Sequence, residues 1–318
     1  MKIGIFVLDK TSACLEIKHQ FLKKINLTFS NSPSFYAWIT FGLLGLTWGS
    51  SYILIKKGLV AFSAEQVACI RISLSAIAFF PFFLLRLKKV DWSKWKAMMV
   101  VGFAGSFFPA FLFATAQTEL SSSTTGVLSS LTPLFTLLLG VSLFGVAFNW
   151  VKVLGVLVGL FGATLLILLN REIDQTGSTW YGILVVIATG CYGLSSNTVK
   201  TYLQEMSSLT ISAVSFEIIG IPAIIYLFTT NFIFVLQENE HAWPSLGYLL
   251  ILSLAGTVLA TILFFKLVQM KSAVFASMVS YLIPLVALLW GFLDGEIIAP
   301  FHLFGMGLIL MGVYISRK

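Results

Sequence analysis

The chain is a succession of long apolar runs separated by short polar connections. Ten runs of about 20 residues are each long enough to cross a hydrocarbon core of roughly 30 Å as a helix. They cover about 36–56, 66–86, 97–115, 124–146, 150–170, 180–200, 209–230, 245–266, 273–293 and 300–316. The connections leave no room for a soluble catalytic domain. The pattern therefore predicts an all-α membrane protein with ten transmembrane helices.

Composition and charge fit this prediction. Of the 318 residues, 58% are hydrophobic and 10% are charged, whereas soluble domains carry roughly 25% charged residues. The formal net charge is +7, and the charged residues lie mostly between the apolar runs. We therefore interpret them as orientation signals and expect no binding to nucleic acid. A cytoplasmic amino terminus leaves Lys56, Lys57, Arg71 and Arg171 toward the outer side and puts the other 16 of 20 lysines and arginines inside. We expect a multi-pass protein of the cell (inner, cytoplasmic) membrane with both termini cytoplasmic.

Residues 1–34 are too polar to cross the membrane and are predicted to form a cytoplasmic N-terminal extension. Their apolar run, Ile3–Leu8, is shorter than the core of a signal peptide. Residues 15–25 could lie on the membrane surface as an amphipathic helix. A disordered tail, or a start codon assigned too far upstream, accounts for the extension equally well.

An internal repeat organises the rest of the chain. Residues 129–140 and 280–291 both read S-x-L-x-P-L-x-x-L-L-x-G, and 12 of the 37 positions in 104–140 are identical to those 151 residues later. Trp48-Gly49 likewise parallels Tyr192-Gly193.

The repeat predicts two halves of five helices each, residues 35–170 and 180–318, joined by an outer-side linker at 171–179. Five is an odd number, so the second half starts on the opposite side of the membrane. The two repeats are therefore expected to be inverted, an architecture typical of secondary transporters.

Pro133 and Pro284 occupy equivalent positions in the fourth and ninth predicted helices. Proline removes a backbone donor, so it frees a carbonyl one turn earlier, at Ser129 and Ser280. We predict a pair of helix kinks. These kinks either shape a cavity wall or serve only packing, since proline is common in membrane helices.

These features together resemble the drug/metabolite transporter (DMT) superfamily, EamA branch. The resemblance rests on Trp48-Gly49-Ser50-Ser51, the paired S-x-L-x-P segments, Gly295-Glu296 and ten helices. It implies a ten-helix permease whose cavity is lined by spans 1, 3, 4, 6, 8 and 9 and which moves small metabolites, often outward. Members often carry Gly-Glu after both the fourth and ninth spans. This chain has Gly145-Val146 in the first copy, which puts in doubt any role that needs both carboxylates.

A mostly apolar cavity with a few polar groups is expected to bind the substrate. Its candidate lining residues are polar or aromatic and lie inside spans 1, 4, 6 and 9: Trp48, Ser51, Ser129, Tyr192, Ser195, Asn197 and Ser280. The two aromatic rings could stack on a planar substrate or hold a cation, or could anchor their helices at the membrane interface. The hydroxyl and amide groups could equally join helices by hydrogen bonds.

Some ionisable residues within the apolar spans are further candidates. Glu217 is the candidate for proton coupling or for recognition of an amine, unless it is a neutral acid bonded to a neighbouring helix or lies near the headgroups. Arg71 could receive an anionic substrate or pair with Glu65, although snorkelling to the headgroups is the simpler interpretation. Lys200, which shares its repeat position with Lys56, also fits snorkelling or a gate-closing pair.

The leading hypothesis is a secondary active transporter of small metabolites that works by alternating access, most simply as an exporter. An importer, exchanger or facilitator of the same fold, or a non-transporting membrane protein, is the alternative. No cofactor or metal site is expected, because the chain shows no phosphate-binding loop, metal-ligand spacing or nucleophile motif, so an enzyme is not predicted. The glycines of Gly155-x-x-x-Gly159 permit close helix contact within the chain or in a homodimer.

Overall fold

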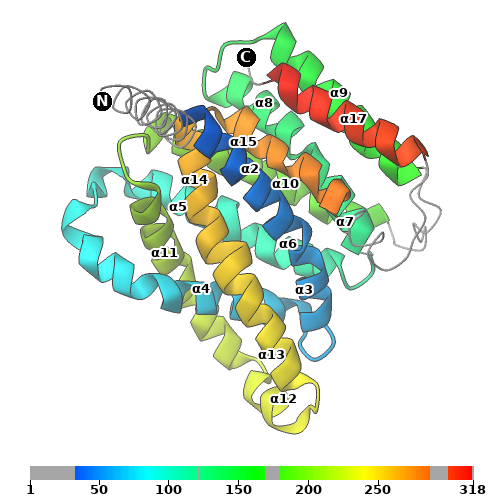
Figure 1. Cartoon of the computed structure of the whole chain (residues 1–318). Coiled ribbons are helices and arrows are strands. Elements are labelled where there is room, and N and C mark those ends of the chain that lie inside the picture. The colour runs from blue at the N-terminus through cyan, green and yellow to red at the C-terminus, as the bar shows by residue number, and fades with distance from the viewer. Residues whose placement is uncertain (1–32, 121, 169–178, 287–299, 317–318) are drawn as a thin grey trace, which may run out of the picture. The chain divides into compact units, whose positions relative to one another are not determined.

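The computed structural model describes residues 33–120, 122–168, 179–286 and 300–316 (Figure 1). The chain divides into two compact units, residues 1–40 and 41–318. The first contributes the beginning of helix α2, and all packing described below lies within the second. Most of the predicted N-terminal extension, nearly all of the predicted linker and the Gly295-Glu296 pair lie outside the described residues.

Every element of the described chain is helical. The first half of the described chain holds α2 (Pro33–Gly49), α3 (Ser51–Gly58), α4 (Ala64–Arg86), η1 (Leu87–Lys89), η2 (Trp92–Lys94), α5 (Trp95–Gly102), η3 (Phe103–Phe107), α6 (Phe108–Ala116), α7 (Ser122–Leu128), η4 (Ser129–Leu131), α8 (Thr132–Leu143) and α9 (Trp150–Leu168). The second half holds α10 (Thr179–Tyr202), α11 (Ser208–Thr229), α12 (Phe232–Glu238), α13 (Ala242–Ile251), η5 (Leu252–Leu259), α14 (Ala260–Met270), α15 (Ala273–Ser277), η6 (Met278–Tyr281) and α17 (Pro300–Ser316). The all-α prediction is confirmed.

Several of these elements join into longer apolar helices. Within the described residues, six are long and apolar enough to cross a membrane: Phe35–Gly58, Ala64–Lys89, Trp92–Ala116, Trp180–Tyr202, Ser208–Thr229 and Ala242–Met270. Shorter apolar helices cover Ser129–Leu143, Trp150–Gly162 and Ala273–Val286. The count of ten spans stays a prediction.

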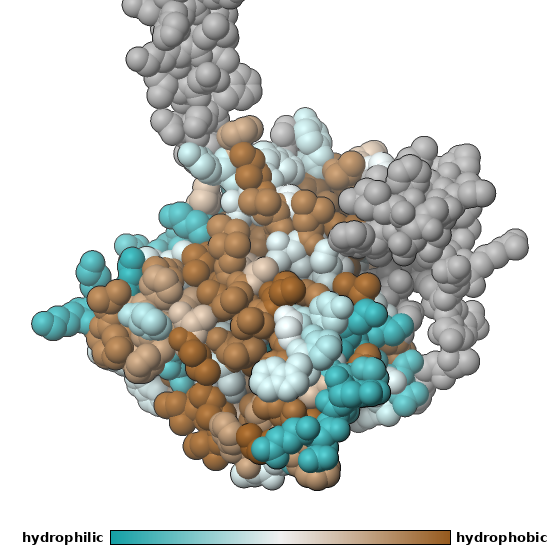
Figure 2. Space-filling view, turned by 60° about the horizontal axis from the view of Figure 1, so that its bottom comes forward, coloured by the Kyte–Doolittle hydropathy of each residue, from teal (hydrophilic) through white to brown (hydrophobic). Residues whose placement is uncertain are grey.

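Apolar side chains cover much of the outer surface. Figure 2 shows them spread across one face, with hydrophilic side chains gathered at its left edge and lower right. Leu85, for example, is 79% exposed, and Trp150 and Phe161 are also exposed. A surface of this kind suits hydrocarbon rather than water, so the chain is a multi-pass membrane protein.

Helices α4 and α11 begin in the same way and pack against each other. Ser63 caps the first turn of α4 by accepting from Gln66 N at 3.4 Å, and Ser207 caps α11 by accepting from Thr210 N at 3.2 Å. The two caps are 144 residues apart, the same spacing as Trp48 and Tyr192. The sequence correspondence between the halves therefore extends to these helices.

The third helix of each half contains a π-helical segment at the same repeat position. Phe103–Phe107 lies between α5 and α6, and Leu252–Leu259 lies between α13 and α14. A glycine in each segment packs closely against a serine of the other half. A Cβ at Gly105 would fall 2.5 Å from Ser195 Oγ, and one at Gly256 would fall 2.8 Å from Ser51 Oγ. Segments of this type are frequent at functional sites.

A short 3₁₀ turn precedes each of the paired prolines. The turn η4 ends two residues before Pro133, and η6 ends three residues before Pro284. The Ser129 carbonyl accepts a hydrogen bond from Thr132 Oγ1 at 2.6 Å, so a hydroxyl satisfies a group that a continuous helix would bond to residue 133. The helices thus change winding where the sequence predicted kinks.

Glycines bring α9 and α17 into close contact, and Figure 1 shows the two helices side by side. A Cβ at Gly312 would lie 2.5 Å from Gly159 N and 2.6 Å from Gly155 O. A Cβ at Gly159 would in turn meet the ring of Tyr281 at 2.5 Å. The glycines considered for a homodimer therefore pack within the chain.

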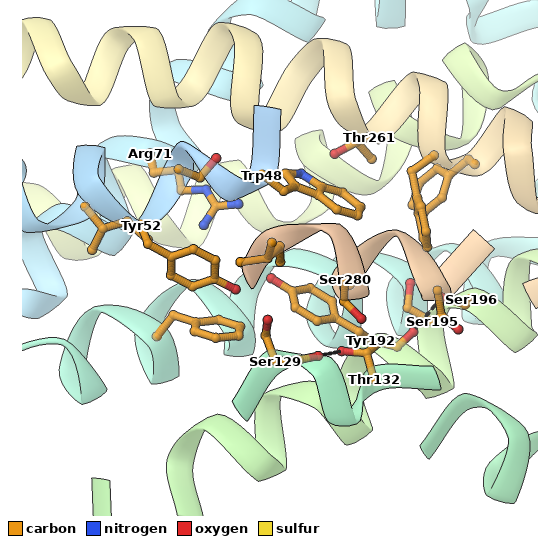
Figure 3. A pocket seen from close by; sticks show the side chains of 18 residues that line it. Trp48, Tyr52, Arg71, Ser129, Thr132, Tyr192, Ser195, Ser196, Thr261 and Ser280 are labelled. Carbon is orange, nitrogen blue, oxygen red and sulfur yellow. Dashed lines mark hydrogen bonds between the residues drawn. The ribbon is translucent and has the colours of Figure 1, made fainter. Parts of the chain in front are cut away.

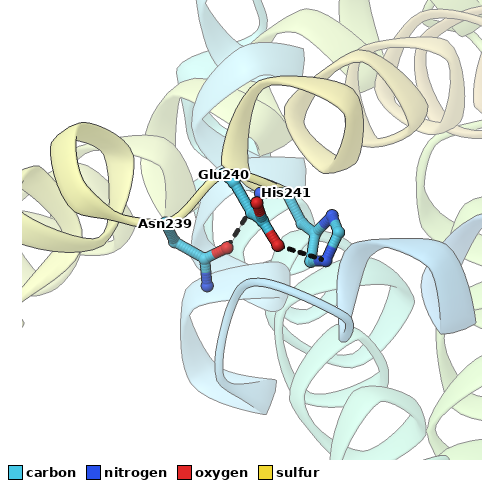
Figure 4. Close-up of polar contacts among 3 residues, drawn as sticks. All are labelled: Asn239, Glu240 and His241. Atoms are coloured by element: carbon cyan, nitrogen blue, oxygen red, sulfur yellow. Dashed lines mark hydrogen bonds and ion pairs between the residues drawn. The ribbon is translucent and has the colours of Figure 1, made fainter.

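Polar groups gather at the turn between α12 and α13 (Figure 4). The Asn239 side chain accepts from His241 N at 2.9 Å, and His241 Nε2 lies 3.4 Å from Glu240 Oε1. Glu240 is almost fully exposed, at 86%. This turn is a surface feature at the end of a span.

We predict that Gly312→Leu lowers the thermal unfolding midpoint of the purified protein in detergent. The new side chain would collide with the backbone of α9, and overpacking of this kind costs about 1–3 kcal/mol. Gly307→Leu is the matched control, since a Cβ there meets nothing within 4 Å. Equal midpoints for the two variants would contradict the close α9–α17 contact.

Candidate functional site

One cavity brings together residues from both halves of the chain (Figure 3). The empty space within it is about 800 Å³, a value that includes the part open to solvent. We call it the main cavity. Its described lining residues are Trp48, Ser51, Tyr52, Ile55, Arg71, Gly105, Phe113, Ser129, Thr132, Tyr192, Ser195, Ser196, Thr261, Phe264, Phe265, Ser277, Ser280 and Ile283.

Aromatic pairs join the two halves across the main cavity. The ring of Trp48 lies 5.1 Å from that of Phe264, and the ring of Tyr192 is stacked on Phe113 at 5.8 Å. These pairs are equivalent, because Trp48 corresponds to Tyr192 and Phe113 to Phe264 in the repeat. The first helix of each half therefore rests against the third helix of the other.

The π-helical segment of the second half explains how Trp48 is held. A π-helical turn shifts the backbone bonds from i−4 to i−5 and leaves a carbonyl available to another donor. Trp48 Nε1 donates to the Gly256 carbonyl at 3.0 Å. Trp48 is thus fixed inside the protein, and its indole N–H is not an interfacial anchor.

Most hydroxyls that line the main cavity bond to their own helix. Ser51 Oγ donates to Thr47 O at 2.9 Å, and Ser196 Oγ donates to Tyr192 O at 2.7 Å. Ser129 Oγ donates to the Gly126 carbonyl. Such local bonds satisfy the donor and leave an oxygen lone pair that can face the cavity.

Two cavity hydroxyls differ from the others. Ser195 and Ser280 are 2% and 6% exposed, and the Oγ atom of each is buried without a hydrogen-bond partner among the described residues. A buried hydroxyl without a partner is costly and calls for an explanation. Both side chains lie on the cavity wall (Figure 3), so a bound polar molecule would provide the missing partner.

Arg71 reaches the main cavity from α4 instead of snorkelling to the headgroups. Its Nε donates to Thr257 Oγ1 at 2.8 Å, in the π-helical segment of the second half. The guanidinium also interacts electrostatically with the phenol of Tyr192. It forms no ion pair with any carboxylate of the described chain, Glu65 included.

Asn197 was predicted beside the substrate, but the structure places it between α8 and α10. It is 2% exposed, and its Nδ2 donates to Thr136 O at 2.8 Å and Gly193 O at 2.9 Å. It is not among the described residues that line the main cavity. Its bonds are those of a residue that holds two helices together.

Glu217 and Lys200 lie apart from the described lining of the main cavity. Glu217 is half-buried on α11, and its Oε1 has no hydrogen-bond partner among the described residues. Lys200 is half-buried as well and donates to Gln269 O at 2.9 Å. Because Gln269 Nε2 donates to Met206 O at 2.7 Å, these bonds tie the end of α10 to the end of α14.

Sequence reasoning missed several lining residues, although signals for some were present. Tyr52 follows Trp48 by four residues and so shares its helix face. Phe113 and Phe264 are identical residues 151 positions apart, and this equivalence is a signal that both belong to the cavity wall. Thr261 carries no such signal, because its inward direction depends on the π-helical segment before it.

The fold and cavity define a polytopic membrane protein with an internal cavity lined by residues of both halves of the chain. The model of the EamA-like transporter family matches residues 36–168 and again 179–317. The chain therefore belongs to the EamA-like transporter family, as its sequence resemblance indicated.

Curated relatives match over most of their length. An "uncharacterized transporter" of Archaeoglobus fulgidus is 24% identical over 87% of this chain and 97% of that protein. The "uncharacterized inner membrane transporter YedA" of Escherichia coli is 26% identical over 86% of this chain and 87% of that protein. A "probable terminal-alkyne amino-acid exporter" of Streptantibioticus cattleyicolor is 23% identical over 86% and 90%.

The fold also occurs in an experimental structure. A protein of known crystal structure superposes with a TM-score of 0.66 at 14% identity, covering 88% of this chain and 96% of the other. At that identity the likeness concerns the fold alone.

We predict different stability effects for two neighbouring substitutions on α10. Asn197→Ala removes the donor to two buried carbonyls, so it should lower the free energy of unfolding by about 1–3 kcal/mol. Ser195→Ala removes a hydroxyl that has no partner and should leave stability unchanged or raise it. Thermal unfolding of both variants in the same detergent tests this, and a greater loss for Ser195→Ala would contradict it.

Proposed function

We propose that the chain is a secondary active transporter of small metabolites, working as an exporter by alternating access. The observation that carries this proposal is the main cavity, because corresponding positions of both halves supply its walls. Rocking one half against the other would open such a cavity to each side in turn. Trp48, Ser51, Ser129, Tyr192, Ser195 and Ser280 are the proposed substrate contacts, and Pro133 and Pro284 lie where the wall changes helix winding.

The proposed membrane arrangement is two inverted five-helix repeats with both termini cytoplasmic. The repeated family match at residues 36–168 and 179–317 supports two repeats. The charges of the Arg86–Lys96 loop support the orientation.

In that loop Asp91 accepts from Ser93 N at 3.1 Å, and its hydrogen bonds with Ser93 lower the pKa of its carboxyl group.

Export is favoured over import by one relative, whose name describes an amino-acid exporter. An importer, exchanger or facilitator would use the same cavity. Enzymatic activity has less support, because the family and the matched relatives are named as transporters. We propose no cofactor.

We predict that cells that overproduce the protein release at least one small metabolite that cells lacking it retain. Comparison of the growth media by mass spectrometry, with equal cell lysis verified, identifies the compound. Matched cells that produce the double variant Ser195→Leu and Ser280→Leu provide the control, since the larger side chains fill the main cavity. Release that is unchanged by filling the cavity would contradict transport through it.

We propose Glu217 as the coupling residue. A carboxylate with a buried, unpartnered oxygen on a membrane helix is costly unless it is protonated, paired or hydrated. Its neighbour Phe216 packs on Phe79 of α4, with ring centroids 5.1 Å apart. Because α11 packs along α4, we propose that protonation of Glu217 biases this helix contact and thereby the state of the transporter, away from the described lining of the main cavity.

We predict that Glu217→Gln abolishes accumulation driven by a pH gradient and keeps exchange between preloaded vesicles. Glutamine has nearly the same shape but cannot release a proton. Glu240→Gln, at the exposed turn of Figure 4, is the matched control and should behave like the unmodified protein. Accumulation by Glu217→Gln that still follows the pH gradient would contradict the coupling role.

A further inference from the structure

We infer that the main cavity binds organic anions, most simply carboxylates with an apolar or aromatic body, through Arg71. This inference rests on the proposed transport function and names its class of substrate. It depends on three observations: a guanidinium that forms no ion pair among the described residues, its presence in only one half of the repeat, and two buried hydroxyls without partners in the described part of the chain.

Arg71 is the charged side chain among the described residues that line the main cavity. Its hydrogen bond to Thr257 uses Nε and orients the guanidinium, which interacts with the phenol of Tyr192. Figure 3 shows Arg71 at the same end of the labelled group as Tyr52. An arginine inside a membrane protein is costly and marks a functional site by default. A guanidinium without a protein carboxylate is suited to bind a carboxylate through two parallel hydrogen bonds.

The charge also breaks the symmetry of the repeat. The position equivalent to Arg71 lies 144 residues later and is Ser215. Ser215 Oγ donates to the Met98 carbonyl, with 3.1 Å between the two oxygens. Neither residue is among the described residues that line the main cavity. Aromatic and hydroxyl positions, by contrast, recur in both halves. The shared positions therefore build the cavity, whereas Arg71 gives one end of it a charge that the repeat does not require.

The remaining surface of the cavity complements the rest of such a ligand. The rings of Trp48, Phe113 and Phe264 offer apolar faces. The buried Oγ atoms of Ser195 and Ser280 have no hydrogen-bond partner in the described ranges. In Figure 3 Arg71 and Ser195 lie toward opposite ends of the labelled group. A ligand with an anionic head, an apolar body and a second polar group would meet each of them. A simple amine would face the guanidinium charge with no described acid in the lining to offset it.

Three probes of the same size separate charge from shape: 3-phenylpropanoate, 3-phenylpropanamide and 3-phenylpropylamine. Their binding is measured by equilibrium dialysis against the full chain in lipid nanodiscs. We expect the carboxylate to bind at least about tenfold more tightly than the amide, and the amine to bind most weakly. Equal affinity of carboxylate and amide, tighter binding of the amine, or binding of none of the three would overturn the inference.

Variants then test whether Arg71 is responsible. Arg71→Gln should weaken carboxylate binding at least about tenfold and leave amide binding unchanged, which also shows that the variant is folded. Arg71→Lys keeps the charge but loses the bidentate geometry, so it should fall between the two. Arg86→Gln is the matched control, because Arg86 bonds to Ser207 outside the described lining of the main cavity. Carboxylate preference that survives in Arg71→Gln would overturn the assignment.

Failure of this inference and failure of the proposed function give different results. If vesicles containing the protein transport the compound found in growth media, and Arg71→Gln transports it equally well, the anion assignment is wrong and transport stands. If carboxylate binding depends on Arg71 while vesicles transport neither the bound carboxylate nor any released metabolite, transport is wrong and the anion site stands.

Discussion

The structure depends on a crossed contact between its two halves, in which the first helix of each half rests on the third helix of the other. Gly105 and Gly256 permit this contact, since a side chain at either would collide with a serine of the opposite half. The contact also imposes a requirement on the backbone, because a membrane interior offers little water to satisfy exposed carbonyls. The π-helical segments at these glycines supply irregular backbone, and the indole of Trp48 bonds to the carbonyl that one of them exposes. Close packing and hydrogen bonding between the halves therefore occur at the same π-helical segments, and the cavity lies beside them.

The polar groups of the cavity follow from the same requirement. Most hydroxyls bond back to their own helix, which satisfies their donors without a second helix. Such bonds leave oxygen lone pairs on the cavity wall that could accept hydrogen bonds from a ligand. Ser195 and Ser280 depart from the rule, and they do so at positions that the repeat alignment and the aromatic contacts place on the cavity wall. Burying these two hydroxyls without partners lowers the stability of the fold, which is expected where a protein binds a ligand.

Much of the fold could be predicted because the bilayer restricts what a sequence can form. Apolar runs of fixed length, the paired prolines and the glycine register all carry physical signals that one sequence displays. The direction of individual side chains could not be predicted in the same way. Arg71 was expected at the headgroups, since snorkelling is the usual solution for a cation near a helix end, and only the approach of Thr257 from a π-helical segment redirects it. Asn197 carried the signal of a cavity residue, but the close approach of α8 to Gly193 gives its amide two carbonyls to satisfy.

The charge of the proposed cargo changes what the transporter needs for energy. A monoanion that leaves a cell with a negative interior gains about 2.3 kcal/mol per 100 mV of membrane potential, which corresponds to a concentration ratio of roughly 50. Export of such an anion needs no coupled proton. A proton-linked role of Glu217 would then serve accumulation beyond this ratio, or would set the conformational equilibrium between the two open states. The roles proposed for Arg71 and Glu217 are therefore separate: Arg71 would select which molecules enter the cavity, and Glu217 would set the direction of transport.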